Sequence, residues 1–126
     1  MKYAYNPDQK KSARVYGRGL RISTQSSGVV CKVITGMRLE KGKALLQGLI
    51  DQKRNLSGKY YTNATKLILS TVKSAEANAE AKGLDPESLH IHATAHKGFT
   101  FYRPRGQKRR REQAKVTNLQ VVLEAK

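Results

Sequence analysis

The chain has 126 residues, the length of a single domain, and its 25 Lys and Arg against 9 Asp and Glu give a formal net charge of +16. The single cysteine, Cys31, excludes an internal disulfide framework and a CxxC metal site, and no signal peptide or long apolar run is present. We therefore expect one basic domain, 1–126, in a reducing, soluble compartment, with a polyanion as partner and neither membrane association nor a homo-oligomer.

Residues 1–20 are polar and basic and are punctuated by Pro7, Gly17 and Gly19. This composition predicts an extended, partly mobile N-terminal arm. The cations that line it, Arg14, Arg18 and Arg21, are candidate polyanion-binding residues.

Two helices are predicted after this arm. Ser23 or Thr24 can cap the first, which ends near Gly36. Its expected apolar face consists of Val29, Val30, Val33 and Ile34. The second begins at Glu40 and places Leu45, Leu46, Leu49 and Ile50 at helical spacing.

A basic loop with two aromatic residues follows at 53–61. Its candidate polyanion-binding residues are Lys53, Arg54, Lys59 and Tyr60. Tyr60 and Tyr61 either stack on bases or pack over the edge of the core, and the residues leave both interpretations open.

The third helix is the clearest element and is expected over 63–82, with Asn63 as N-cap and Gly83 just beyond its end. Its apolar stripe is formed by Leu67, Ile68, Val72, Ala75 and Ala79. The alanines of its second half predict a surface that another element approaches closely, and a turn at Pro86 follows.

Two strands end the chain. Leu89, Ile91, Ala93 and Ala95 alternate with polar residues in a register that continues to Phe99 and Phe101, and a second strand runs from Val116 to Leu123. Antiparallel pairing would leave residues 97–115 as a hairpin arm reaching roughly 30 Å beyond the core. Such an arm is marginal in water, so we expect it to become ordered only against a partner.

The tip of this hairpin is the most cationic part of the sequence, because six of the nine residues 103–111 are Lys or Arg. Phe101 and Tyr102 precede it, a pattern typical of binding to unpaired bases. The charge alone does not distinguish RNA from DNA or anionic lipid. The candidate binding residues of the arm are Lys97, Tyr102, Arg103, Arg105, Lys108, Arg109, Arg110, Arg111 and Lys115.

The sequence gives little support for catalytic or metal-binding chemistry. His90, His92 and His96 lie on the polar face of a strand, where a zinc site would need further ligands. No G-x-S-x-G motif is present, and the stretch from Gly36 to Lys43 lacks the spacing of a phosphate-binding loop. We expect no metal, no cofactor and no enzymatic activity.

Five segments, in this order, carry a resemblance to a known family. They are Gly17-Arg18-Gly19-Leu20-Arg21-Ile22-Ser23, Ile34-Thr35-Gly36-Met37-Arg38-Leu39-Glu40, Ser74-Ala75-Glu76-Ala77-Asn78-Ala79-Glu80, Ala95-His96-Lys97-Gly98 with Arg103-Pro104-Arg105, and Thr117-Asn118-Leu119-Gln120-Val121-Val122-Leu123. From about Asn6 to Glu124 the chain resembles the universal large-subunit ribosomal protein twenty-two family, called protein seventeen in eukaryotes. The Tyr16-Gly17-Arg18 and Ala95-His96-Lys97-Gly98 segments are similar to its archaeal and eukaryotic branch.

The resemblance implies an α+β fold in which three helices pack on a small antiparallel sheet with a long protruding β-hairpin. It implies a structural protein of the cytoplasmic ribosome that binds large-subunit rRNA beside neighbouring ribosomal proteins. It also implies that the hairpin tip lines the nascent-peptide exit tunnel and meets the nascent polypeptide. The tip residues are Pro104, Arg105, Gly106, Gln107 and Lys108.

The chain departs from the family pattern at three places. Thr24 stands where relatives often have Pro, Gly106 follows Arg105 directly, and the loop between the second and third helices is short.

Two other functions are alternatives to the ribosomal one. The second candidate is a free-standing architectural protein that binds nucleic acid, and the third is a nucleic-acid enzyme that uses the histidines.

Overall fold

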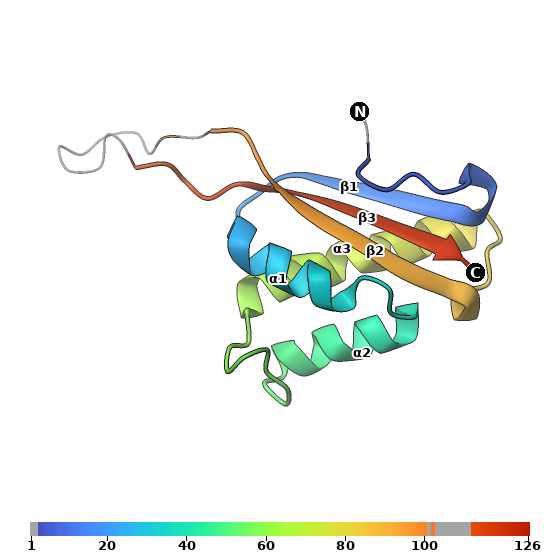
Figure 1. Ribbon diagram of the computed structural model, residues 1–126, viewed down its shortest axis with the longest axis horizontal. Coiled ribbons are helices and arrows are strands. Elements are labelled where there is room, and N and C mark those ends of the chain that lie inside the picture. Colours follow the sequence, from blue (N-terminus) through green and yellow to red (C-terminus); the bar gives the residue numbers. More distant parts are fainter. Residues whose placement is uncertain (1–2, 101, 103–111) are drawn as a thin grey trace.

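The computed structural model describes residues 3–100, 102 and 112–126 (Figure 1). In these ranges, three helices pack on a three-stranded antiparallel sheet, which confirms the α+β fold. The helices are α1 (Thr24–Ile34), α2 (Leu39–Ile50) and α3 (Thr62–Ala81). The strands are β1 (Ser12–Leu20), β2 (Leu89–Lys97) and β3 (Thr117–Ala125). Two short 3-10 helices, η1 (Gln9–Lys11) and η2 (Pro86–Ser88), precede β1 and β2.

Strand β3 occupies the centre of the sheet and pairs antiparallel with both β1 and β2. In the predicted hairpin, β2 pairs with β3 from Leu89 opposite Ala125 to Lys97 opposite Thr117. β3 is buried on both faces, with Val121 under the helices and Val122 on the opposite face.

The prediction of an N-terminal arm is wrong for residues 12–20, which form β1 and pair with β3. Ala13 and Val15 face the core, while Arg14 and Tyr16 alternate with them on the other face. Gly17 and Gly19 weaken the strand signal in the sequence because glycine has low strand propensity. The register shift between Gly17 and Leu20 marks an irregularity at that point.

Residues Tyr3–Pro7, here called the N-terminal strap, lie on the face of the sheet that the helices leave open. The backbone N–H of Ala4 donates to Gln120 Oε1 over 2.9 Å, and the Tyr5 hydroxyl donates to Glu124 Oε2 over 2.6 Å. The Tyr5 ring stacks on His92 with 4.0 Å between ring centroids. The strap therefore covers this face of the sheet and helps to bury Val122 and Gln120, which are 2% and 7% exposed.

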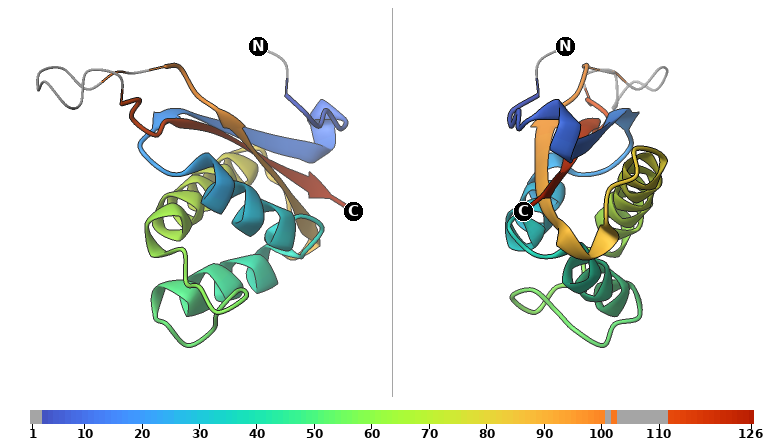
Figure 2. Two further views of the ribbon diagram at one scale, coloured as in Figure 1. Left: turned by 60° about the vertical axis from the view of Figure 1, so that its left-hand side comes forward. Right: turned by 90° about the vertical axis from the view of Figure 1, so that its right-hand side faces the viewer.

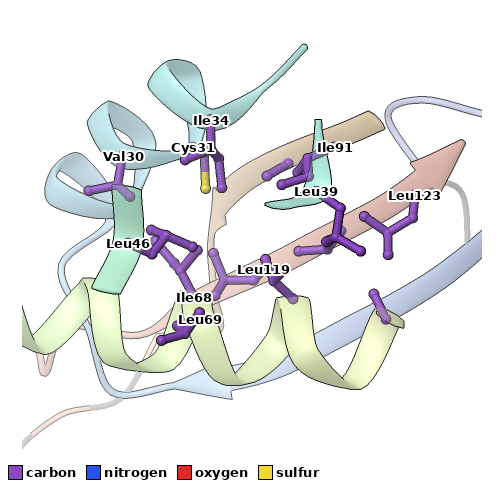
Figure 3. Close-up of a cluster of buried hydrophobic side chains, with 14 of the residues drawn as sticks. Val30, Cys31, Ile34, Leu39, Leu46, Ile68, Leu69, Ile91, Leu119 and Leu123 are labelled. Atoms are coloured by element: carbon purple, nitrogen blue, oxygen red, sulfur yellow. The ribbon is translucent and has the colours of Figure 1, made fainter. Parts of the chain in front are cut away.

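The core lies between the sheet and the three helices (Figure 3). Ile34 of α1, Leu46 of α2, Ile68 of α3 and Leu119 of β3 are fully buried there. The predicted close approach at the alanines of α3 is confirmed for Ala75 and Ala79, which are fully buried, but not for Ala77 and Ala81, which are exposed. Close packing of these groups is the main source of stability in a domain of this size.

Most predicted helix features are confirmed, with two corrections. Ser23 caps α1 through its side chain, and Gly36 and Gly83 follow the ends of α1 and α3. The N-cap of α3 is Tyr61, in a left-handed backbone conformation with no side-chain cap bond, and not Asn63. On α1, Cys31 joins the buried face, while Val29 is 41% exposed.

A buried chain of hydrogen bonds joins α1 to the start of β3. The Thr117 hydroxyl donates to the carbonyl of Ile22 over 2.8 Å, so its oxygen accepts from the Thr24 hydroxyl, also over 2.8 Å. Proline at position 24 would lack this hydroxyl. Thr24 thus ties the start of α1 to the sheet.

We predict that Thr117→Val lowers the free energy of unfolding by about 1–3 kcal/mol, because Ile22 keeps a buried carbonyl without its donor while side-chain shape is conserved. Urea denaturation measures the change. Thr94→Val is the matched control, since the Thr94 hydroxyl makes only a 3.4 Å contact with Gln120. Equal losses in both variants would contradict a special role for Thr117.

Candidate nucleic-acid interface

One end of the domain gathers several segments that lie far apart in the sequence. β1 ends here, α1 and α3 begin here, and the chain between β2 and β3 leaves the domain here (Figures 1 and 2). A helix N-terminus carries about half a positive charge from its aligned peptide dipoles. Two such termini at one end favour an anion there.

Five cations lie at this end of the domain, four of them in recesses at the helix starts and Arg18 near the end of β1, and we call them the basic end. They are Arg18, Arg21, Lys59, Lys97 and Lys115, and all are exposed. Arg21 and Lys115 line one recess with Ser26, Tyr61 and Asn63 at the starts of α1 and α3. Lys97 and Lys115 line a groove between α1 and the base of the arm. Lys59 lies beside the first turn of α1. The structure therefore brings together five of the predicted residues.

Several acidic residues of the described chain lie away from the basic end, whereas Glu112 lies in the arm. Asp8, Asp85, Glu87 and Glu124 lie toward the other end of the sheet, near η1, η2 and the end of β3 (Figure 1). Lys43 forms an ion pair with Glu76 at 2.7 Å, away from the basic end.

The loop 51–61 divides its predicted residues between two surfaces. Lys59 joins the basic end, whereas the Arg54 side chain packs beside Gly48 of α2 and lines a recess with Arg38, Lys41 and His90. An isolated β-bridge between Arg38 and His90 holds two sides of that recess together. We call Arg38, Lys41 and Arg54 the α2 patch.

The two tyrosines of this loop have different surroundings. Tyr61 is partly buried and packs against the core, while Tyr60 is 36% exposed. Lys53 is exposed as well. Core packing therefore accounts for Tyr61, and Tyr60 remains available for stacking.

The analysis of the sequence did not identify Lys32, Arg38 or Lys41 as candidates. Lys32 lies on α1 in the same recess as Lys59, and the other two belong to the α2 patch. These lysines and arginines sit singly within amphipathic helical patterns, where a cation is an ordinary solvent-facing residue. Only the tertiary packing places them beside other cations.

Arg14 lies apart from the basic end. Its guanidinium lies 5.3 Å from the centroid of the Tyr3 ring and donates to the Pro7 carbonyl over 3.4 Å. These contacts hold Arg14 beneath the N-terminal strap.

The arm is described only in part. Tyr102 is 55% exposed and forms an isolated antiparallel bridge with Gln113. The predicted tip residues Pro104, Gly106 and Gln107 lie outside the described residues. So do the predicted cations Arg103, Arg105, Lys108, Arg109, Arg110 and Arg111.

The histidines and the cysteine occupy unrelated positions. The His92 ring lies under Tyr5 with its Nε2 3.6 Å from Glu124, and burial lowers its pKa. His90 Nδ1 lies 3.2 Å from the Ser88 carbonyl, and His96 is exposed. Burial raises the pKa of the Cys31 thiol to about 12. Within the described ranges, no three His, Cys, Asp or Glu side chains group in a way that could hold a metal ion.

No helix in the described part of the chain combines the length and the apolar character needed to cross a bilayer. The geometry defines a class of protein: an α+β domain with exposed cations at the end where the chain between β2 and β3 leaves it.

The sequence comparisons identify the family within that class. Residues 15–124 match the family described as "Ribosomal protein L22p/L17e". A relative from Methanococcus aeolicus, named "Large ribosomal subunit protein uL22", is 33% identical, covering 98% of this chain and 96% of its own. Proteins with the same name from Archaeoglobus fulgidus and Methanocaldococcus jannaschii are 34% and 33% identical, covering 82% and 98% of this chain and 81% and 94% of their own lengths. The chain belongs to the L22p/L17e family of ribosomal proteins, which are structural components of the cytoplasmic ribosome and not enzymes.

The alignment with the Methanococcus aeolicus protein extends over 147 positions, more than the 126 residues of this chain. The relative therefore has residues that this chain lacks.

Proposed function

We propose that this protein is a structural constituent of the large ribosomal subunit that binds the rRNA of that subunit through its basic end. Family membership supports the ribosomal role. The observation that carries the RNA-binding role is the convergence of Arg21, Lys59, Lys97 and Lys115 around the starts of α1 and α3. Arg18 lies at the same end of the domain, near the end of β1.

The chemistry of this end suits phosphates. Lysine supplies a compact charge that moves on a flexible stem, and arginine supplies a planar fork of donors. Each phosphate that is neutralised releases condensed counterions, which makes binding favourable and sensitive to salt. The backbone N–H groups of the first turns of α1 and α3 add contacts without side-chain entropy loss.

The α2 patch gives the protein a second cationic surface. Arg38, Lys41 and Arg54 surround one recess at the side of α2, and no acidic residue lines it in the described chain. Phosphates of an RNA segment can contact this surface while another segment contacts the basic end. Contacts of this kind fix the position of a protein on RNA without reading its sequence.

We further propose that the arm continues this surface into the nascent-peptide exit tunnel, with Pro104, Arg105, Gly106, Gln107 and Lys108 at its tip. The resemblance of the flanking segments to the family supports this placement, and the tip itself lies outside the described residues. Neighbouring ribosomal proteins and the nascent polypeptide are then partners of the arm.

For the basic end, we predict that changing Lys59, Lys97 and Lys115 together to Ala weakens binding to large-subunit rRNA about tenfold or more near physiological salt. The slope of log affinity against log salt should fall by about 2 to 3, because three phosphate contacts are lost. Filter binding or fluorescence anisotropy over a range of salt concentrations measures both quantities.

The matched control changes Lys10, Lys11 and Lys126 to Ala, which removes the same charge from exposed positions near the other end of the sheet. We expect this control to keep most of the salt slope. Equal loss in both triple variants would show that net charge, and not the basic end, governs binding.

For the arm, we predict that a photoreactive residue at position 107 crosslinks to the nascent chain in translating ribosomes, because the tip would face the tunnel. Mass spectrometry of the crosslinked products identifies the partner. A photoreactive residue at Gln9, near η1, is the control and should give no such crosslink. Crosslinks from position 107 only to RNA or proteins on the solvent side would contradict the tunnel placement.

A further inference from the structure

Phe99 is a large apolar side chain at the surface, at the base of the arm. It is 54% exposed and is not part of the core cluster. Its ring rests on Gly19, whose φ is +70° and where an added Cβ would lie 2.9 Å from Phe99 Cε1. Glycine at position 19 thus lets the ring lie against the backbone while about half of the side chain stays open to solvent.

The ring forms one wall of the groove between α1 and the arm, which has a volume of about 330 Å³. Lys97 precedes Phe99 on one side of the arm, Lys115 lies on the other side, and both line the groove together with Gln25 and Gln113. No acidic residue lines the groove in the described chain.

The two sides of the arm are held together where the groove begins. The Gly98 N–H donates to the Val116 carbonyl over 2.9 Å, and an added Cβ on Gly98 would lie 3.1 Å from Val116 backbone atoms. Pairing of Lys97 with Thr117 precedes this contact. The spacing of Lys97 and Lys115 is therefore set by the sheet.

An exposed ring, two flanking ammonium groups and side-chain amides are the groups that bind an unpaired nucleotide. Bases stack on aromatic side chains, cations hold the adjoining phosphates, and amides pair with base edges through one acceptor and two donors. A base within a duplex is stacked on its neighbours and does not offer a free face.

We infer that this groove holds one unpaired base of RNA, which stacks on Phe99 while Lys97 and Lys115 contact the adjoining phosphates. The inference rests on the proposed function and deepens it. The basic end then does more than neutralise phosphates, because it distinguishes an RNA with an unpaired base at this point from a continuous helix.

Two RNA hairpins of equal length and charge test the inference with the full chain. One carries a single bulged 2-aminopurine, and the other carries the same base paired within the stem. We expect the wild-type protein to bind the bulged hairpin about tenfold more tightly and to quench its 2-aminopurine fluorescence, as stacking does.

Substitutions at Phe99 separate stacking from apolar packing. Phe99→Tyr keeps the ring and should keep the preference and the quenching. Phe99→Leu keeps an apolar side chain of similar bulk without an aromatic face and should lose both, with affinity for the paired hairpin and its salt slope unchanged. Circular dichroism checks that each variant folds. We expect both variants to fold, because Phe99 is exposed.

Retention of the preference by Phe99→Leu would overturn the inference and leave the proposed function intact. An equal affinity of the wild-type protein for both hairpins would overturn it as well. Absence of salt-dependent binding to either hairpin would count against both the inference and RNA binding by the basic end.

Discussion

Pairing of β3 with two strands at once is the constraint on which the rest of the molecule depends. β3 joins β1 and β2, which lie far apart in sequence, and both of its faces are buried. Its first residue, Thr117, also fixes the start of α1 through Ile22 and Thr24. The point where the arm leaves the domain and the point where α1 begins are therefore parts of one rigid corner.

Because this corner is fixed by the sheet, a chain with a net charge of +16 can hold the cations of the basic end in defined positions. Like charges repel, and gathering Lys97, Lys115 and Arg21 around two helix N-termini costs free energy in the isolated protein. Burial of residues such as Leu119 and Ile68 stabilises the fold against this cost. In the proposed function, a bound polyanion would remove this repulsion, and the release of the repulsion would contribute to affinity.

Local signals in the sequence predicted the elements whose stability is mainly local or strongly periodic. The helical spacing of Leu45, Leu46 and Leu49 and the alternation from Leu89 to Ala93 correctly indicated α2 and β2. β1 was missed because its glycines hide the pattern of Ala13 and Val15, and because its partner lies at the other end of the chain.

Charge in the sequence indicated many of the candidate residues, but not how they group. Lys59 and Arg54 are close in sequence, yet the fold turns them toward different surfaces. The groove at Phe99 depends on contact between β1 and the arm, at Gly19, which no local pattern records. Long-range packing decides such groupings, so they emerge only with the tertiary structure.

Reactivity of lysines toward an amine-labelling reagent tests the central claim most directly. The full chain is labelled alone and in complex with large-subunit rRNA, and mass spectrometry gives the extent of labelling at each lysine. We expect rRNA to protect Lys59, Lys97 and Lys115 strongly, while Lys10 and Lys11, exposed near the other end of the sheet, stay reactive. Protection of Lys10 and Lys11 with Lys97 and Lys115 left reactive would contradict binding through the basic end.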